Sequence, residues 1–473
     1  MSVAQRLVSA PVVGLVQRSL GDSEGVWIAG GAVRDAALGR EVVDLDLAVA
    51  DNPAAVVKAV AREGEGHSFE LSAEFATWRA VAADGSWQID ATALRGETIE
   101  ADLAERDFTI GAVAVPIVGG EAIDPFGGLA DLDRRVLRVV GERSFSADPL
   151  RLLRAARLAA GLALEIDPGT ASLARGEAAR AAEPAGERQL AELRQLVGGP
   201  DPLRGMALLD ELGLTAAILP ELEALRGVEQ GPNHHLDVHG HTMAVLERTL
   251  EVEADLERFG GDRAADIQAL LDEPLADEMT RGTALRFGAL LHDMGKPATR
   301  SEQQGFVTFV GHDRDGVGTV GGLCKRLRAS RVLTRHLQDL TLHHLRLGFL
   351  VHEAPLPARR VHEYLRATEP VGADVTLLTI ADRLSARGSG PFATEEAIEA
   401  HLGLAKEMLA AALDWRRDGP PQPLLRGDEL ATELGIGEGP ELGELLAGLE
   451  AAQYAGEIST RDEAVECARA LRG

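Results

Sequence analysis

The chain has 473 residues and a net charge of -27, with 45% hydrophobic and 26% charged residues. This length is too great for one hydrophobic core, so we expect about three or four domains. The strong negative charge excludes a general binder of polyanions, because such binding needs Lys and Arg to neutralise phosphates.

Cysteine content and hydropathy point to the cytoplasm. Cys324 and Cys467 are the only cysteines, which is too few for a disulfide framework or a cysteine metal cluster. The sequence contains no stretch of about 18 uninterrupted apolar residues and no N-terminal apolar segment before a cleavage site. We therefore expect neither membrane insertion nor export.

The predicted elements change character along the chain. Short β-rich runs mix with helical pieces in the first third, and Asp148 begins a long region with helical spacing and one further β-like piece at 305–310. The predicted strands are 26–29, 42–49, 77–81, 110–116 and 136–140, with a helix over 52–63. The fold class is therefore α+β, a small mixed β-sheet with helices followed by all-α domains.

Glycine and proline mark the expected boundaries. Breaks are predicted near Gly141, near 227–231 and in the proline-rich segment 418–423, because proline removes a backbone donor and ends a helix. The predicted domains are 1–140, 141–228, 229–405 and 406–473.

Two aspartates stand on one predicted strand. The alternation of two residues sends Asp44 and Asp46 to the same face, while Leu45 and Leu47 point to the other. Two neighbouring carboxylates repel unless they share a cation, and hard oxygen ligands favour Mg²⁺. The pattern predicts a magnesium site, and a solvated strand face is the alternative.

A glycine turn precedes this strand. Gly30 and Gly31 permit close approach of a ligand to the backbone, and residues 32–38 can begin a helix whose free N–H groups face phosphates. A phosphate cradle and a metal pair within about fifteen residues suit phosphoryl transfer.

These residues resemble a known family, the class II CCA-adding tRNA nucleotidyltransferases and bacterial poly(A) polymerases, of the polymerase-β nucleotidyltransferase superfamily. The resemblance rests on ordered motifs: GGAVRD at 30–35 with DLD at 44–46, ERDFTIGA at 105–112, DPFGGLADL at 124–132, DPLRLLRAAR at 148–157, and Glu187-Arg188 with Glu192. It implies that 1–140 is the nucleotidyltransferase head and 141–228 a helical neck and body that binds nucleotide and RNA. It also implies that Arg34 and Arg106 bind nucleotide.

The chain departs from the family pattern at several positions. Glu105, Gly111 and Ala147 stand where the family has Arg, Asn and an acidic residue. The interval from Asp90 to Asp107 is short, and in the family this region often holds a loop needed for the final A-addition. Asp90 is either a third carboxylate from a neighbouring strand or an aspartate at a strand end.

The segment from Asp148 is predicted to select the nucleotide. Asp148 is the expected N-cap of a helix with Pro149 at its first position. A carboxylate acceptor and guanidinium donors at spacings of three match the edge of cytosine or adenine, as a nucleic-acid template does. The arginines assigned to nucleotide binding here are Arg151, Arg154 and Arg157. They belong to a group of seven arginines over 134–157, for which ion pairs with nearby acids are the alternative.

A second set of residues lies in the helical region. His241, the pair His292-Asp293 and Asp382 supply imidazole and carboxylate ligands from separate segments, which suits Mn²⁺, Ni²⁺ or Fe²⁺. The set, with the HDMGK block at 292–296, resembles the HD phosphohydrolase domain, expected here over 229–405. The candidates for a second metal position are His312, His343 and His344.

The resemblance implies an enzyme that adds CCA or CC to the tRNA 3′ end from CTP and ATP, with Mg²⁺ at Asp44 and Asp46. The HD region is expected to act as a phosphatase or cyclic phosphodiesterase on RNA ends. Within the family, the alternatives are a poly(A) polymerase and a CC-adding specialist. From another class, the alternative is an HD phosphohydrolase with a degenerate head.

Overall fold

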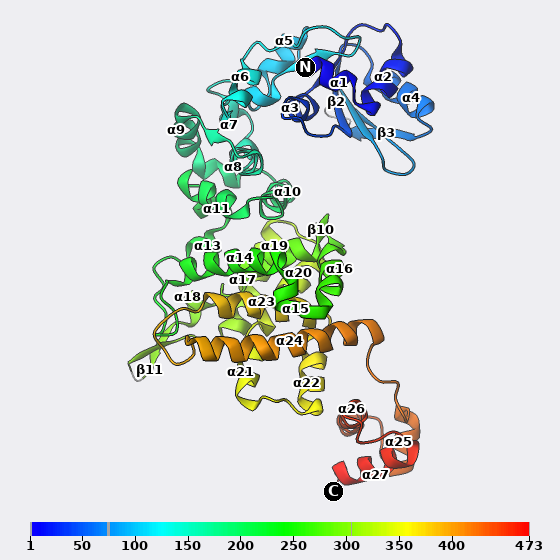
Figure 1. Cartoon of the computed structure of the whole chain (residues 1–473), viewed down its shortest axis with the longest axis vertical. Coiled ribbons are helices and arrows are strands. Elements are labelled where there is room, and N and C mark those ends of the chain that lie inside the picture. The colour runs from blue at the N-terminus through cyan, green and yellow to red at the C-terminus, as the bar shows by residue number, and fades with distance from the viewer. Residues whose placement is uncertain (1, 73–75, 304, 473) are drawn as a thin grey trace. The chain divides into compact units, whose positions relative to one another are not determined.

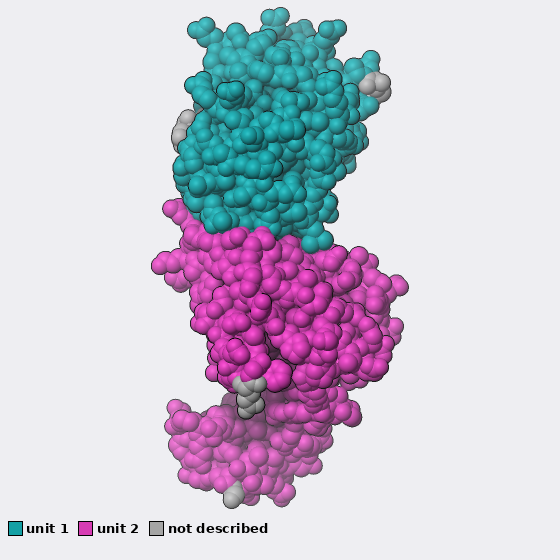
Figure 2. All heavy atoms as spheres, turned by 90° about the vertical axis from the view of Figure 1, so that its left-hand side faces the viewer, with its two compact units in different colours: residues 1–218 teal, residues 219–473 magenta. Residues whose placement is uncertain are grey.

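The computed structural model describes residues 2–72, 76–303 and 305–472. The chain forms two compact units, residues 1–218 and 219–473 (Figure 2). The large β-sheet belongs to the first unit and the second is built mainly of helices (Figure 1). The predicted α+β class is therefore confirmed.

The first unit begins with a mixed six-stranded sheet in the order β3-β4-β5-β2-β1-β6. The pair β2–β5 is parallel, and the other neighbouring pairs are antiparallel. The strands are β1 (Val26–Ala29), β2 (Asp44–Val49), β3 (His67–Ser72), β4 (Thr77–Val81), β5 (Gln88–Ala93) and β6 (Ala114–Pro116).

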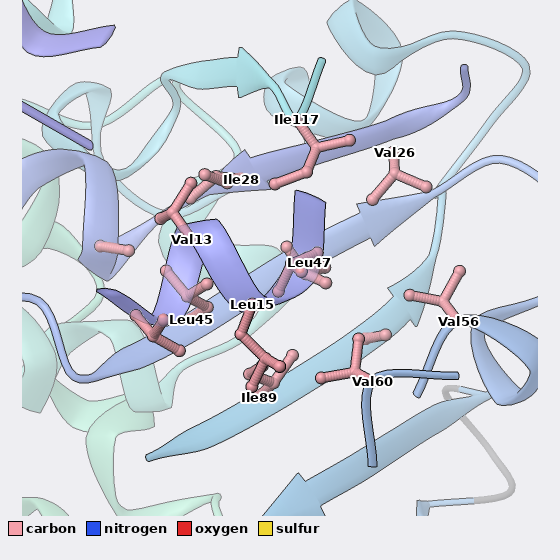
Figure 3. Close-up of a cluster of buried hydrophobic side chains, with 14 of the residues drawn as sticks. Val13, Leu15, Val26, Ile28, Leu45, Leu47, Val56, Val60, Ile89 and Ile117 are labelled. Carbon is pink, nitrogen blue, oxygen red and sulfur yellow. The ribbon is translucent and has the colours of Figure 1, made fainter. Parts of the chain in front are cut away.

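Helices α2 (Pro11–Leu20) and α4 (Pro53–Glu63) contribute apolar side chains to a core on one face of this sheet (Figure 3). Leu45 and Leu47 of β2 are both buried in that core, whereas Asp44 and Asp46 are exposed. Alternation along the strand therefore places the two carboxylates on the face opposite the core, as predicted.

The predicted strand over 110–116 is wrong in its first half. Residues Thr109–Gly111 form a 3-10 helix, and β6 begins only at Ala114. The Thr109 hydroxyl donates to the Asp131 carboxylate at 2.8 Å, and a Cβ at Gly128 would lie 2.0 Å from the Thr109 carbonyl oxygen. These contacts with helix α6 (Gly128–Asp133) fix the turn. The apolar pattern of residues 110–116 does not predict these contacts, because they involve residues further along the chain.

The remainder of the first unit is mostly helical. Helix α8 (Leu150–Leu162) packs against α10 (Gly186–Val197) and α11 (Pro202–Glu211), with Leu152, Leu153 and Ala156 buried. The predicted strand at 136–140 is shortened to β7 (Val136–Leu137), which pairs with β8 (Glu165–Ile166). The other helices are α1 (Val3–Val8), α3 (Gly31–Ala37), α5 (Ile99–Ala104), α7 (Ser144–Ala147), α8 (Leu150–Leu162), α9 (Pro168–Gly176), α10 (Gly186–Val197), α11 (Pro202–Glu211) and α12 (Thr215–Ile218).

The helices of the second unit enclose several buried polar groups. A buried ion pair between Arg281 and Asp374 joins α17 (Arg281–Leu291) to α23 (Gly372–Ser385). Two short hairpins, β9 (Pro274–Ala276) with β10 (Met279–Thr280) and β11 (Ser301–Gln303) with β12 (Phe306–Thr308), lie between the helices. The helices are α13 (Pro220–Glu223), α14 (Val238–Ala254), α15 (Leu256–Gly260), α16 (Ala264–Asp272), α17 (Arg281–Leu291), α18 (Lys296–Thr299), α19 (His312–Arg326), α20 (Arg331–His343), α21 (Arg346–Leu350), α22 (Ala358–Thr368), α23 (Gly372–Ser385) and α24 (Glu395–Asp418).

The C-terminal segment has a small core of its own. Residues 419–426 contain no helix or strand, in agreement with the proline-rich break predicted there. Leu430, Leu445, Leu449 and Ala468 contribute to an apolar cluster formed by α25 (Gly427–Leu434), α26 (Pro440–Tyr454) and α27 (Arg461–Arg472). None of the described helices has the length and apolar character needed to cross a membrane.

Candidate functional sites

A cavity of about 380 Å³ opens in the first unit beside the polar face of β2. It brings together residues that are far apart in the sequence: the glycine turn after β1, the strand β2 and the start of α8. The predicted residues that line it are Gly30, Gly31, Arg34, Asp46, Arg106, Asp148, Arg151 and Arg154. Arg157 and Asp44 are not among the lining residues.

Asp46 lies where β2 meets β5. The parallel register places it directly opposite Asp90. The residue as a whole is exposed, but partial burial of its carboxylate and the neighbouring Asp90 raise the pKa of Asp46, while Arg106 opposes that shift. Such a carboxylate is poorly compensated by the protein itself, and a cation would stabilise it.

Asp90 has a partner in the sheet. Arg79 of the adjacent strand β4 donates to both of its carboxylate oxygens, through Nε and Nη2, each at 2.7 Å. This bidentate pair neutralises Asp90 and occupies both oxygens. The structure therefore places Asp90 beside the paired aspartates, but with its ligand atoms engaged.

The glycine turn brings the backbone close to charged groups. Gly30 has φ +72°, and a Cβ there would lie 2.8 Å from Arg106 Nη1 and 3.4 Å from Asp46 Oδ2. Only glycine fits this conformation and this space. Asp102 accepts from Arg106 Nε at 3.2 Å and from Nη2 at 3.1 Å, so the guanidinium is held toward the turn.

Asp148 lies before α8 and begins the helix differently from the prediction. The first helical residue is Leu150 and Pro149 is the N-cap, one position later than expected. Asp148 Oδ1 still accepts from the Leu150 N–H at 3.1 Å, and Oδ2 accepts from Arg188 Nη2 at 3.0 Å. Arg188 also lines the cavity. The sequence placed it only in the neck motif.

Arg151 is anchored to the backbone. Its Nη2 donates to the Glu105 carbonyl at 2.6 Å, and its Nη1 to the Ser144 carbonyl at 3.3 Å and hydroxyl at 3.1 Å. These acceptors engage the Arg151 guanidinium, which the spacing of Asp148 and Arg151 in the sequence had assigned to a nucleotide base. The exposed donor beside Asp148 is thus Arg188, whose side chain is 52% exposed.

The next two arginines of α8 pair with acids. Arg154 donates to Asp107 at 2.9 Å and to Glu192 at 3.2 Å, and Arg157 donates to Glu192 at 2.5 Å. Burial would raise the pKa of Asp107, but Arg154 outweighs it and the pKa is lowered. Arg157 therefore fits the ion-pair alternative, and Arg154 combines an ion pair with a place on the cavity wall.

The second candidate site is a cluster of histidines and aspartates in the second unit. Two groups of three have metal-binding geometry: His241, His292 and Asp382, and Asp293, His312 and His344. His241 Nε2 lies 3.0 Å from Asp382 Oδ1, and His292 Nε2 lies 3.1 Å from Asp293 Oδ2. Helices α14, α19 and α23 supply His241, His312 and Asp382, while His292 and Asp293 follow the end of α17 and His344 follows the end of α20. The chain separates these residues by up to about 140 positions.

Buried charges interact strongly in this cluster. Burial would raise the pKa of Asp293, but His292 and Lys296 hold it well below its usual range, and the Lys296 ammonium lies 2.7 Å from Asp293 Oδ2. Burial lowers the pKa of His344 to about 3, so its imidazole is neutral at pH 7 and can serve as a ligand.

His343 is separated from the cluster although it adjoins His344. Its Nδ1 accepts from Arg346 Nε at 2.8 Å, and it belongs to neither metal-binding group. Lys296 was not singled out from the sequence, although it closes the HDMGK block. Its ammonium also donates to Gln230 Oε1 at 2.7 Å.

Known families match most of the chain. Residues 26–138 match the poly A polymerase head domain, residues 163–225 the probable RNA and SrmB-binding site of polymerase A, and residues 239–387 the HD domain. The fold and the cavity thus define a nucleotidyltransferase that also carries an HD domain. Both kinds of domain depend on metal ions.

Relatives specify the family. The chain is 36% identical to the A-adding tRNA nucleotidyltransferase of Deinococcus radiodurans, over 93% of this chain and 94% of that protein. It is 33% identical to the CC-adding enzyme of Thermus thermophilus, over 92% and 91%. The chain belongs to the tRNA nucleotidyltransferase family.

A solved structure has the same fold. The CCA-adding enzyme of Thermotoga maritima, in complex with tRNA, covers 100% of this chain and 99% of its own, with a TM-score of 0.61 and 20% identity. This likeness extends over both units.

Proposed function

We propose that the chain adds nucleotides to the 3′ end of tRNA without a nucleic-acid template, using CTP and ATP. The reaction joins the terminal ribose oxygen to the α-phosphorus and releases pyrophosphate. The proposal rests on one observation: Asp46, the Gly30 turn, Arg106 and Asp148 before α8 line the same cavity. The names of the relatives support tRNA as the acceptor.

Asp44 and Asp46 would hold Mg²⁺ in the head. They fit this ion because they stand on one strand face, both exposed, and Mg²⁺ commonly binds one or two carboxylates while keeping several waters. Bound there, the ion neutralises phosphate charge and acidifies the attacking hydroxyl. Arg79 already neutralises Asp90, so we assign the ion to the two residues of β2 alone.

The glycine turn and two arginines would position the triphosphate. The Gly30 and Gly31 backbone permits close approach of phosphate oxygens. Arg106, held by Asp102, presents its guanidinium at the turn, and Arg34 lines the same wall. Planar guanidinium groups bind phosphate oxygens through paired hydrogen bonds.

Asp148 would select the base by its hydrogen bonding. Cytosine and adenine both carry an exocyclic amino donor where uracil and guanine carry a carbonyl acceptor. A carboxylate accepts a hydrogen bond from the amino group of cytosine or adenine, and it repels the carbonyl oxygen of uracil or guanine. Arg188 supplies a neighbouring donor for a ring nitrogen, while Arg151 fixes the start of α8 through its carbonyl contacts.

Asp148→Ala is expected to weaken discrimination of CTP over UTP by about 5- to 150-fold, because one well-formed pair contributes about 1–3 kcal/mol. The measurement is kcat/KM for CTP, ATP, UTP and GTP on a tRNA that lacks CCA. Asp133→Ala, an exposed residue at the end of α6, is the control and is expected to keep the wild-type ratios. Unchanged ratios in Asp148→Ala would exclude this role for the carboxylate.

A specialist for one nucleotide is the second candidate. Two relatives of similar identity carry the names of specialists, one A-adding and one CC-adding. The interval between Asp90 and Asp107, where β5 is followed closely by α5, is short. Supplying acceptors that end before CCA or after CC separates complete CCA addition from either specialist, and a long A tail would identify a poly(A) polymerase.

For the HD region we propose a metal-dependent phosphatase or cyclic phosphodiesterase that acts on RNA ends. His241, His292, Asp293 and Asp382 would hold a transition metal such as Mn²⁺, Ni²⁺ or Fe²⁺. The fit rests on buried ligand atoms: neither His241 Nε2 nor His292 Nε2 has a well-directed hydrogen bond within the described residues. Bound there, the ion supplies an activated water for phosphoester hydrolysis.

The cytoplasm is the compartment that this function implies. Cys324 and Cys467 are both free thiols, as expected in a reducing environment.

A further inference from the structure

We propose that Phe69, on the edge strand of the six-stranded sheet, is a stacking platform for a base near the 3′ end of the acceptor RNA, with Arg79 beside it contacting the RNA backbone. This inference rests on the proposed nucleotide addition at Asp46 and adds a binding surface for the acceptor strand. The occupant of this surface is a single strand of RNA.

A row of paired residues joins Phe69 to the proposed metal site. Asp46 on β2 stands opposite Asp90 on β5, and Asp90 stands opposite Arg79 on β4. Arg79 in turn stands opposite Phe69 on β3, the strand at the edge of the sheet. Residues directly opposite one another on neighbouring strands project from the same face. The sheet face that carries Asp46 therefore continues to Phe69.

This face is open at Phe69. The elements that pack most closely on β3 are β4 and helix α4, and α4 belongs to the core on the opposite face through Val56 and Val60. Phe69 is 45% exposed, and so is Leu71, which lies within the shift of the β3–β4 register. Exposed apolar side chains on an edge strand favour unwanted association. A dedicated partner for this edge explains why they are present.

Phe69 and Arg79 together have the chemistry that binds single-stranded RNA. Aromatic side chains stack on unpaired bases of any type, and cationic groups beside them contact the backbone. Arg79 uses Nε and Nη2 for Asp90, at 2.7 Å each, and its Nη1 donates to no acceptor among the described residues. The Arg79 side chain is 27% exposed. A ring for a base and a donor for a phosphate thus stand on adjacent strands.

The separation between Phe69 and Asp46 fits a short single strand. Neighbouring strands lie about 4.8 Å apart, so three intervals place the two residues roughly 14 Å apart. A stacked nucleic-acid strand advances about 3.4 Å per nucleotide, so the base on Phe69 would lie at most about four nucleotides before the reacting hydroxyl. The Gly30 turn follows β1, which lies on the other side of β2. The triphosphate and the acceptor strand would therefore approach Asp46 from opposite sides.

The test is the effect of Phe69→Ala on acceptor binding by the full-length chain. The acceptor is whichever tRNA the wild-type protein extends, one that ends before CCA or one that ends in CC. Loss of one stacked base, about 1–3 kcal/mol, is expected to raise the KM for tRNA by about 5- to 150-fold. The KM for the nucleotide is expected to stay at the wild-type value. Phe69→Trp keeps a flat ring and is expected to retain both values.

Ser68→Ala is the matched control, because Ser68 adjoins Phe69 on β3 but stands opposite Ala80, which is buried on the core face. It is expected to keep both KM values. Acceptors with one abasic nucleotide among the last four locate the stacked base. At one position the abasic change should weaken binding to wild type and leave binding to Phe69→Ala unchanged. Phe69→Thr, with its high strand preference, replaces Phe69→Ala if that protein melts at a lower temperature.

An unchanged KM for tRNA in Phe69→Ala, with nucleotide addition intact, would overturn the platform alone. A wild-type dimer that becomes monomeric in Phe69→Ala, measured by light scattering, would overturn it in favour of pairing between two copies of the chain. Failure of the wild-type protein to extend either tRNA would overturn the proposed nucleotide addition and the platform with it.

Discussion

Asp46→Asn is expected to lower the kcat of nucleotide addition by about 10³-fold or more, because a metal ion contributes several kcal/mol of charge stabilisation. The carboxylate is the one member of the β2 pair that lines the cavity, and its pKa is raised by partial burial and by Asp90. The amide keeps the shape of the side chain but loses its charge. The measurement is incorporation of labelled CTP and ATP into tRNA lacking CCA.

The matched control for this change is Asp51→Asn, an exposed aspartate two residues beyond the end of β2. It is expected to leave the rate unchanged. Asp44→Ala should also abolish incorporation without loss of fold, because Asp44 is exposed. Activity of Asp46→Asn within tenfold of wild type would contradict the assignment of the metal to β2.

The second large effect is expected from His292→Ala/Asp293→Ala. This double variant removes two of the four ligands proposed for the HD metal. Hydrolysis of an RNA 2′,3′-cyclic phosphate should fall to background and metal content should drop, while CTP and ATP addition persists. Both changes are measured on one preparation, by metal analysis and by the two assays in parallel.

Stability needs its own measurement in this variant. Removal of Asp293 leaves the buried Lys296 ammonium without its carboxylate, and breaking a buried pair costs about 3–5 kcal/mol. Thermal melting of Asp293→Asn, which retains the size of the side chain, separates folding from metal loss. His352→Ala, an exposed histidine, is the control. Unchanged metal content in the double variant would refute the site.

The local sequence pattern was sufficient to predict the parts of the site that lie within one strand or one turn. The alternation in β2 predicted that Asp44 and Asp46 share a face, and the structure places both opposite the core. The glycine turn at Gly30 was also predicted, and its φ of +72° together with the nearby Arg106 explains why no side chain fits there.

Contacts between distant elements could not be read from spacing. Arg151 follows Asp148 by three residues, as a base-reading pair would, yet carbonyls at Glu105 and Ser144 engage its guanidinium. Arg79 on β4 donates to both carboxylate oxygens of Asp90 on the neighbouring strand β5. These partners come from other segments, so only the folded chain brings them together.

In the histidine cluster, too, the sequence did not predict which of two neighbouring residues faces the site. His343 and His344 are adjacent residues of the same type, and the sequence analysis therefore named both as candidate metal ligands. Consecutive residues on a helix point about 100° apart, and the end of α20 turns His344 toward Asp293 and His343 toward Arg346.

Nucleotide addition is tested most directly by the 3′-end sequence of a tRNA lacking CCA after incubation with wild-type protein, CTP and ATP. We expect growth by at most about three residues, all C or A, and no growth with GTP or UTP alone. Mass spectrometry of the terminal fragment identifies the product. Extension by G or U, or no extension of either this tRNA or one that ends in CC, would refute the proposed nucleotide addition to the tRNA 3′ end.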